Sequence, residues 1–262
     1  MKNKKSLGQH WLKNRVILDE IADLAVMEGE PISLCLEIGP GLGTLTSSLL
    51  RRFETVIAIE YDEKLAGNLP RSFPGKNLQV IQEDILDTDI ARLVGSKPYV
   101  VVGNIPYYIT SPIIQKLINT IPRPQKIVLL MQKEVAERIA AEPGDHSVLS
   151  LIVQNRAVVE LGPVVPASEF TPPPKIDSQV VVLTPLEAPQ ISDEALTLAK
   201  RGFSSPRKKL VANLATTGIS KAAWREILQN LKINPDARAE DLDLWDWEEL
   251  AKKLLEKSPS ST

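Results

Sequence analysis

Near the middle of the chain, residues 100–112 read Val100-Val-Val-Gly-Asn104-Ile-Pro-Tyr107-Tyr-Ile-Thr-Ser-Pro112. The run of β-branched valines predicts a buried strand, and Gly103 marks its end. An amide, a proline and two tyrosines follow, at the place where the strands of an open α/β sheet usually present their chemistry. This stretch therefore predicts an α/β sheet with a functional edge just beyond this strand.

The residues after this strand are suited to holding a flat ring that carries an amine. Pro106 fixes φ and lacks an N–H, so the backbone of Asn104 and Ile105 is held stiffly. The Asn104 side-chain oxygen and the Ile105 carbonyl can then both accept hydrogen bonds from the amine, with Tyr107 stacked on the ring. The alternative is an ordinary strand-to-helix turn, in which Ser111 caps the helix and Pro112 occupies the first helical position.

Apolar runs and helical patterns alternate on both sides of this stretch. We expect strands at Leu34–Ile38, Thr55–Ile59, Leu78–Ile81, Tyr99–Val102 and Lys126–Met131. Helices are expected at Arg15–Glu28, Thr44–Arg52, Glu63–Ser72, Ser111–Thr120 and Gln132–Ala141. Strands at roughly 20-residue intervals with helices between them indicate a Rossmann-like, doubly wound parallel sheet.

The pattern changes in the last third of the chain. The strand-like runs Ala157–Leu161 and Gln179–Leu183 have no helix between them, so we expect them to pair antiparallel at the edge of the sheet. Beyond Pro185 and Pro189 the pattern is helical, at Ser192–Gly202, Pro206–Thr216, Ser220–Leu231 and Asp246–Lys257. The expected domains are residues 1–185, which hold the sheet, and an all-α domain at residues 190–257, followed by a disordered tail at 258–262.

Composition limits the class of protein. A chain of 262 residues can bury a large core, and its single cysteine, Cys35, leaves no intramolecular disulfide possible, which fits a reducing cytoplasm. No apolar run approaches the roughly 18 residues of a membrane span, and no signal peptide is visible. We therefore expect a cytoplasmic protein that does not associate with membranes.

Positive charge is clustered, although the formal net charge is −2. Two segments, residues 1–15 and residues 200–209, carry lysine and arginine without any acid. The first holds Lys2, Lys4, Lys5, Lys13 and Arg15, and the second holds Lys200, Arg201, Arg207, Lys208 and Lys209. The acids gather instead in residues 240–249. Clustered positive charge predicts that these segments bind a polyanion.

A glycine loop follows the first strand of the sheet. It reads Glu37-Ile-Gly39-Pro-Gly41-Leu-Gly43 and opens a helix. Its G-x-G-x-G spacing differs from the G-x-G-x-x-G of dinucleotide-binding proteins, which argues against a nicotinamide dehydrogenase. An acid two residues before the first glycine is also a feature of S-adenosylmethionine sites, where an α-amino group is bound.

Two further acids follow strands of the sheet. Glu60 ends the second strand, where it can accept both hydroxyls of a ribose, and Asp84 follows the third, where it can accept an adenine amine. Together with the glycine loop and Asn104, these acids predict S-adenosylmethionine as a methyl donor. The histidines, His10 and His146, form no metal or triad constellation, and we expect no metal.

These motifs resemble those of the ribosomal RNA adenine dimethyltransferases that modify two adjacent adenosines in the small-subunit hairpin near the 3′ end. The resemblance runs over nearly the whole chain. It rests on Ser6-Leu-Gly-Gln-His10-Trp-Leu12, Glu37-Ile-Gly-Pro-Gly-Leu-Gly43, Gly103-Asn-Ile-Pro-Tyr107, Gln132-Lys-Glu134, Phe170-Thr-Pro-Pro-Pro-Lys175-Ile-Asp-Ser178 and Phe203-Ser-Ser-Pro-Arg207-Lys-Lys-Leu210.

The resemblance implies roles for particular residues. Residues 1–185 would be the catalytic domain, and the methyl donor would be bound by Gln9, His10, Leu12, Glu37, Gly39, Gly41, Gly43, Glu60, Asp84, Ile85 and Asn104. Tyr107 and Phe170 would sandwich the target base, and Asn104, Ile105 and Pro106 would complete the catalytic set. The stiff segment Pro172-Pro-Pro174 would hold Phe170 in place.

The expected reaction is direct transfer. The amine lone pair attacks the sulfonium methyl in line, and the protein contributes positioning and electrostatics. No strong general base is needed, because the methylated ammonium can lose its proton to water. The product would be N(6)-dimethyladenosine in 16S rRNA, made by a monomer on the immature small subunit during ribosome biogenesis.

RNA contacts are expected from Lys4, Lys5, Arg207, Lys208 and Lys209. Ser205 is expected to cap a helix with Pro206 at its first position, so that the basic residues after it face a phosphate. The alternative is a solvated, charged helix face. The chain departs from the family at Pro206, where the first of two arginines is usual, and at Asp145-His-Ser147, where a Tyr-Gly pair is usual.

Other functions share some of these motifs. Methyltransferases of the large subunit that confer antibiotic resistance have the same donor and amine motifs, but the Phe170–Ser178 stretch and the basic arm favour the small-subunit enzymes. A DNA adenine methyltransferase would more usually show Asp-Pro-Pro-Tyr than Asn104-Ile-Pro-Tyr107. A ribosome assembly factor whose methylation is incidental is the binding-class alternative.

Overall fold

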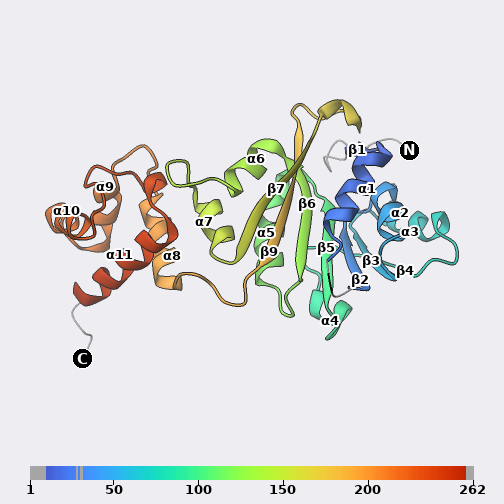
Figure 1. Cartoon of the computed structure of the whole chain (residues 1–262), viewed down its shortest axis with the longest axis horizontal. Coiled ribbons are helices and arrows are strands. Elements are labelled where there is room, and N and C mark those ends of the chain that lie inside the picture. The colour runs from blue at the N-terminus through green and yellow to red at the C-terminus, as the bar shows by residue number, and fades with distance from the viewer. Residues whose placement is uncertain (1–9, 28, 30–31, 258–262) are drawn as a thin grey trace. The chain divides into compact units, whose positions relative to one another are not determined.

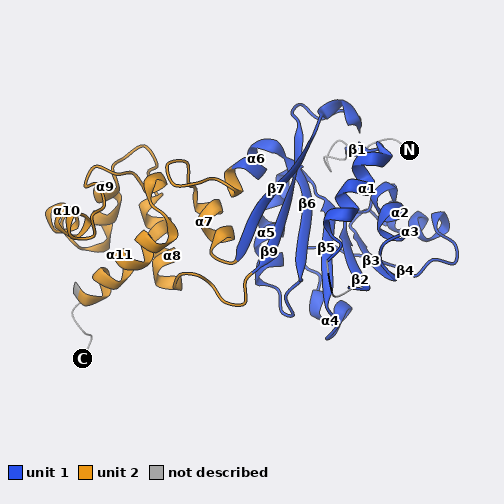
Figure 2. Cartoon of the chain, viewed as in Figure 1, with its two compact units in different colours: residues 1–137, 157–185 blue, residues 138–156, 186–262 orange. Residues whose placement is uncertain are grey.

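The computed structural model describes residues 10–27, 29 and 32–257 (Figure 1). The expectations for Lys4, Lys5, Gln9 and the tail at 258–262 therefore lie outside the described residues. The chain forms two compact units (Figure 2). Unit 1 comprises residues 1–137 and 157–185, and unit 2 comprises residues 138–156 and 186–262.

A seven-stranded sheet forms the centre of unit 1, in the order β4-β3-β2-β5-β6-β9-β7. The strands are β2 Leu34–Ile38, β3 Thr55–Glu60, β4 Leu78–Gln82, β5 Tyr99–Asn104, β6 Lys126–Gln132, β7 Ala157–Val165 and β9 Ser178–Pro185. The first five in this order are parallel, and β9 pairs antiparallel with both β6 and β7. The doubly wound sheet and its antiparallel edge pair are confirmed.

Helices precede, connect and follow the parallel strands of unit 1. They are α1 Arg15–Leu24, α2 Thr44–Leu49, α3 Glu63–Ser72, α4 Ile90–Val94, α5 Thr110–Asn119 and α6 Lys133–Ile139. Local capping starts several of them, since the Asn14 side chain accepts from the first amides of α1 and Asp62 does so for α3. Helix α4 was not expected from the sequence, because a helix of five residues is too short to show a helical period.

Two glycines are required by close packing near the centre of the sheet. A Cβ on Gly103 would lie 2.9 Å from the Ile38 carbonyl oxygen, so the glycine allows β5 to approach β2. Gly43 has φ +80, and a Cβ there would lie 2.7 Å from Leu69 Cδ1. The packing of α2 against α3 therefore requires a glycine at position 43, whether or not a ligand is bound.

A second, small sheet pairs β1, Trp11–Leu12, with β8, Phe170–Thr171, in antiparallel orientation. Leu12 lies opposite Phe170, and both side chains belong to the hydrophobic core of unit 1. Strands of two residues carry no periodic pattern, so the sequence did not predict this sheet. The pairing ties the start of the described chain to a segment more than 150 residues away.

Unit 2 is helical. Its helices are α7 Val148–Gln154, α8 Asp193–Gly202, α9 Leu210–Leu214, α10 Lys221–Asn230 and α11 Leu244–Lys257, and they enclose a core that includes Trp224 and Trp247. The expected boundary at residue 185 placed residues 138–156 with the sheet. In the structure they belong to unit 2, because Leu151 packs in its core and Asn155 Oδ1 accepts a hydrogen bond from Ile191 N at 2.8 Å.

The helix expected from Pro206 begins later than predicted. Residues 206–208 form a turn, in which Lys208 N donates to Ser205 O at 2.9 Å, and α9 starts at Leu210 without a side-chain cap. Asn213 Nδ2 donates to the carbonyls of Gly202 and Ser205 and so fixes this turn. The prediction that Arg207, Lys208 and Lys209 lie on a first helical turn is therefore wrong; all three lie exposed on the segment before it.

Within residues 10–27, 29 and 32–257, no helix is both long and apolar enough to span a bilayer.

Candidate active site

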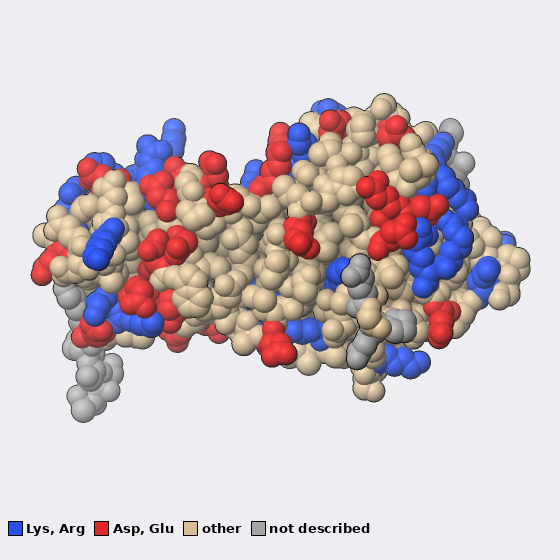
Figure 3. Space-filling model, in the orientation of Figure 1, with Lys and Arg blue, Asp and Glu red and all other residues tan. Residues whose placement is uncertain are grey.

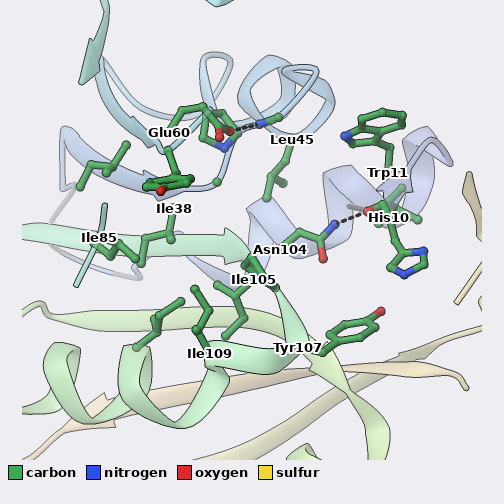
Figure 4. Close-up of a pocket in the computed structure, with 18 of the residues that line it drawn as sticks. His10, Trp11, Ile38, Leu45, Glu60, Ile85, Asn104, Ile105, Tyr107 and Ile109 are labelled. Carbon is green, nitrogen blue, oxygen red and sulfur yellow. Dashed lines mark hydrogen bonds between the residues drawn. The ribbon is translucent and has the colours of Figure 1, made fainter. Parts of the chain in front are cut away.

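Most residues that the sequence assigns to the site line one cavity of about 290 Å³ (Figure 4). The cavity lies at the carboxyl ends of β2, β3 and β5, where the strand order of the sheet reverses. The predicted residues that line it are His10, Leu12, Gly39, Gly41, Glu60, Asp84, Ile85, Asn104, Ile105, Pro106 and Tyr107. Glu37, Gly43 and Phe170 are not among the lining residues.

The Asn104 side chain is oriented by the N-terminal segment. Its amide nitrogen donates to the backbone carbonyl of His10 at 3.1 Å. This engages the nitrogen, and the side-chain oxygen points toward the space above Tyr107 (Figure 4). The atom that faces this space is therefore a hydrogen-bond acceptor, which is what recognition of an amine requires.

The backbone after Asn104 is held by the sheet. Ile105 N donates to Leu130 O at 3.2 Å, which continues the pairing of β5 with β6, and the Ile105 side chain is buried. Pro106 has φ −61 and leads into a 3₁₀ turn at Tyr107–Ile109. Helix α5 then begins at Thr110 without a side-chain cap, so the serine-capped turn considered above does not form.

Tyr107 lies beside His10. Its hydroxyl is hydrogen-bonded to Ser178 Oγ at 2.8 Å, and burial raises the pKa of the phenol, so the ring is neutral at physiological pH. The rings of His10 and Tyr107 are nearly parallel, with centroids 5.8 Å apart, and His10 Nδ1 is 2.8 Å from Pro172 O. Phe170 is only 2% exposed and packs in the core, so the ring beside Tyr107 is that of His10.

Glu60 closes the far side of the cavity. Its Oε2 accepts from Gly41 N at 3.0 Å and its Oε1 from Asp62 N at 2.8 Å. Burial raises the pKa of this carboxyl, while the two amides favour its charged form. Each oxygen retains a lone pair for a further donor, and Glu60 can therefore bind a pair of hydroxyl groups.

Glu37 lies behind the glycine loop. It is 1% exposed, and within the described residues neither of its oxygens, nor the Thr46 hydroxyl nearby, has a hydrogen bond of normal geometry. Burial, with a smaller contribution from the charge of Glu60, raises the pKa of Glu37 to about 8, although Thr46 favours the charged form. A buried carboxyl without a partner favours either a proton or a nearby cation.

Asp84 shapes the loop after β4. Its Oδ1 accepts from Leu86 N at 2.9 Å, and its carbonyl accepts from the Thr88 amide at 3.0 Å and hydroxyl at 2.8 Å. Ile85 is buried between these turns. Asp84 and Ile85 line the cavity, and hydrogen bonds within the loop hold both residues in place.

Three aromatic residues that the sequence did not single out also line the cavity. Trp11 lies over the glycine loop, where a Cβ on Gly41 would come within 3.2 Å of its indole nitrogen. Tyr61 and Tyr108 are 61% and 63% exposed. Each directly follows a predicted site residue, and that adjacency was the only signal available for them.

Over residues 10–27, 29 and 32–257, no group of three or more His, Cys, Asp or Glu side chains is arranged to hold an ion. The cavity offers carboxylates, an amide oxygen, backbone amides and aromatic faces. These groups suit a nucleoside and an amine.

Comparisons with known proteins agree with this arrangement. A family model described as ribosomal RNA adenine dimethylase matches residues 1–256. The chain is 43% identical to the ribosomal RNA small subunit methyltransferase A of Nostoc sp. (strain PCC 7120), over 96% of this chain and 97% of that protein. Among solved structures, a dimethyladenosine transferase from Plasmodium falciparum is similar, with a TM-score of 0.79, 30% identity and coverage of 95% and 98%. The 23S rRNA methyltransferase ErmE has a TM-score of 0.73 and 26% identity, with coverage of 93% and 99%.

Proposed function

The chain belongs to the ribosomal RNA adenine dimethylase family, and from this we propose that it methylates the exocyclic amines of two adjacent adenosines in the 3′-terminal hairpin of small-subunit rRNA. The methyl donor is S-adenosylmethionine and the product is N(6)-dimethyladenosine. The observation that carries the proposal is the Asn104 amide, turned by the His10 carbonyl so that its oxygen faces the cavity.

The residues of the cavity fit the donor. Glu60 would bind the ribose hydroxyls and Asp84 the adenine amine, and the positive-φ glycines Gly39 and Gly41 let the backbone approach closely. Glu37 lies buried behind the glycine loop with its pKa raised to about 8, and a cationic ligand nearby would favour its charged form. When bound, the donor supplies an electrophilic methyl group.

The residues around Asn104 would hold the target amine. The Asn104 oxygen and the Ile105 carbonyl each accept one amine hydrogen, which leaves the nitrogen lone pair free to attack. Tyr107 stacks on the base, a contact that contributes about 1–3 kcal/mol. The methylated nitrogen then loses its proton to water, so no side chain has to act as a strong base.

The space between the rings of His10 and Tyr107 is too narrow for a base. The ring centroids are 5.8 Å apart, which is less than two stacking distances of about 3.5 Å each. The His10 ring therefore leaves its place against Tyr107, or the base stacks on the other face. The sandwich between Tyr107 and Phe170 would further require Phe170 to leave the core, in which it is now buried.

RNA docking is proposed for the basic residues Lys4, Lys5, Arg207, Lys208 and Lys209. The last three lie exposed before α9, with Lys209 paired to Asp236 at 2.8 Å. They would position the RNA through its phosphates. We further propose that the enzyme is a monomer and acts on the immature small subunit.

A direct assay tests the proposal. The protein is incubated with isotope-labelled S-adenosylmethionine and, in separate reactions, with small subunits that lack this modification or with naked large-subunit RNA. The RNA is then digested to nucleosides. Labelled N(6)-dimethyladenosine from the 3′ hairpin is the expected product. Label found only in naked large-subunit RNA would favour the activity that the name of ErmE describes, and no label in either RNA would overturn the proposal.

A further inference from the structure

Lys116, on α5, reaches the loop that carries Asp84. Its ammonium donates to the carbonyls of Leu86 and Thr88, at 2.8 and 2.7 Å. Within residues 10–27, 29 and 32–257 no ion pair engages this lysine, so these two carbonyls are its polar partners. A buried or half-buried ammonium that binds two carbonyls forms charge-assisted hydrogen bonds, which are the stronger kind.

Hydrogen bonds within the loop and hydrogen bonds from Lys116 both hold the loop. Asp84 binds the amides of Leu86 and Thr88 and thereby closes the turn from within. The carbonyls of the same two residues are bound by Lys116. The lysine therefore holds the outer side of a loop that lines the cavity on its inner side with Asp84 and Ile85.

Helix α5 also connects to the amine-binding turn. The helix follows the Tyr107–Ile109 turn without a break, and Ile113, three residues before Lys116, lines the cavity. One short helix is thus continuous with the turn that would hold the base and hydrogen-bonded to the loop that would hold the donor. A helix is stiff over this length, so the two are held in a fixed relation.

We propose that Lys116 is a positioning residue that sets the place of the Asp84 loop, and through it the affinity for the adenosine part of the donor. This inference rests on the proposed function, because it assumes that Asp84 and Ile85 contact the donor. Lys116 does not touch the cavity itself. Its removal leaves the two carbonyls without their partner and frees the loop to move away from α5.

Lys126 provides a matched control. Its ammonium donates to the carbonyls of Leu24 and Val26, at 3.2 and 3.3 Å, and its side chain is half-buried like that of Lys116. It lies at the first residue of β6, opposite Val100, and so at the end of the sheet away from the cavity. Lys126→Met removes the same kind of contact without touching the donor loop.

Calorimetric titration with S-adenosylhomocysteine tests the proposal on the full chain. We expect Lys116→Met to weaken binding by roughly tenfold, because the loop loses both of its charge-assisted hydrogen bonds to α5. Lys126→Met is expected to bind within about twofold of the wild type. Lys116→Arg keeps the positive charge and its N–H donors, so it is expected to lose less affinity than Lys116→Met. Methylation at saturating donor should proceed at nearly the wild-type rate, so that KM rises while kcat changes little.

Two outcomes overturn the inference. One is a folded Lys116→Met variant that binds as tightly as the wild type, and the other is an equal loss in Lys126→Met, which would mean that any such contact serves only stability. Lys116→Gln gives the same test if the methionine variant does not fold. A wild-type protein that binds no S-adenosylhomocysteine would instead refute the proposed function.

Discussion

Asn104 carries two hydrogen-bonding atoms, and the fold uses them differently. The nitrogen is bound by a backbone carbonyl, that of His10, which no side-chain substitution can remove. The oxygen faces the cavity. This arrangement makes the residue a selective acceptor, and it explains why a carboxamide is more useful here than a carboxylate, which could not donate to His10.

Replacing Asn104 with alanine should remove transfer while the donor is still bound. Loss of one preorganised electrostatic contact typically lowers kcat on the order of 10²–10³-fold. Asn119→Ala is the matched control, because that side chain donates to the Gln115 carbonyl on α5 and does not line the cavity. Single-turnover methylation measures the effect, and an Asn104→Ala variant as active as Asn119→Ala would contradict it.

Because Glu37 is a buried carboxyl, we expect the stability of the folded protein to depend on pH. The pKa of this carboxyl is raised to about 8 in the folded protein, so folding favours its protonated form. The stability that this preference contributes is fully present below the ordinary pKa of about 4.3. That effect is lost as the pH rises through the folded value. Glu37→Gln cannot ionise, so its stability relative to the wild type should increase between about pH 5 and pH 9.

The measurement is denaturant unfolding of both proteins across this range, without donor. Burying an amide at this position costs free energy that does not depend on pH. The prediction is therefore tested only by how the difference in stability between the two proteins changes with pH. Two stability curves that stay parallel would show that Glu37 is already ionised or hydrated in the folded protein.

At the scale of elements, the contact between α2 and α3 depends on a glycine. Gly43→Ala would place a methyl group against Leu69 and Phe73, in a backbone conformation with φ +80. Overpacking costs about 1–3 kcal/mol, and the positive φ adds about 1 kcal/mol or more. We expect a clear loss of stability in thermal or denaturant unfolding.

Gly67→Ala is the control for this prediction. Gly67 lies in α3 itself, where a Cβ would meet nothing within 4 Å and φ is not positive. Alanine is the better helix former by about 1 kcal/mol, so this variant should be slightly more stable than the wild type. If both substitutions had the same effect, the tight packing at Gly43 would be refuted.

The elements also show how far sequence reasoning reaches. Strands such as Leu34–Ile38 were predicted to the residue, because a buried parallel strand is a continuous apolar run with clear ends. The start of α9 was not, because Asn213 binds the Ser205 carbonyl and no local pattern reports that contact. Helix α7 was missed as well, since its short apolar run follows a serine cap that resembles a loop.

The same limit holds for the site. Glu60 and Asp84 follow predicted strands, and their meeting at one edge of the sheet follows from topology. The hydrogen bond between Asn104 and His10 joins residues 94 positions apart and depends on the pairing of β1 with β8. The burial of Phe170, and the place of His10 beside Tyr107, follow from that pairing too, and two-residue strands leave no trace in the sequence.

At the scale of the whole molecule, net charge and local charge have different consequences. The chain is slightly acidic, and acidic and basic side chains are interspersed over the face that Figure 3 shows. Some cations are paired within their own helix, as Lys252 is with Glu249 and Lys253 with Glu256 on α11. Such pairs are largely neutralised and are poor phosphate ligands.

Arg207 and Lys208 differ from these cations, because within the described residues neither forms an ion pair, and both lie exposed before α9. If they neutralise phosphates, RNA affinity should fall steeply with salt, and replacing either with alanine should lower the slope of log K against log [salt] by about one.

The control is Lys252→Ala, which should leave the slope unchanged. Binding is measured with a small-subunit 3′ hairpin RNA over about 50–200 mM salt. S-adenosylhomocysteine affinity should be equal in all three variants, because none of these side chains lines the cavity. A slope that Lys252→Ala lowers as much as Arg207→Ala would mean that the RNA responds to total charge, and that the turn before α9 has no special part in docking.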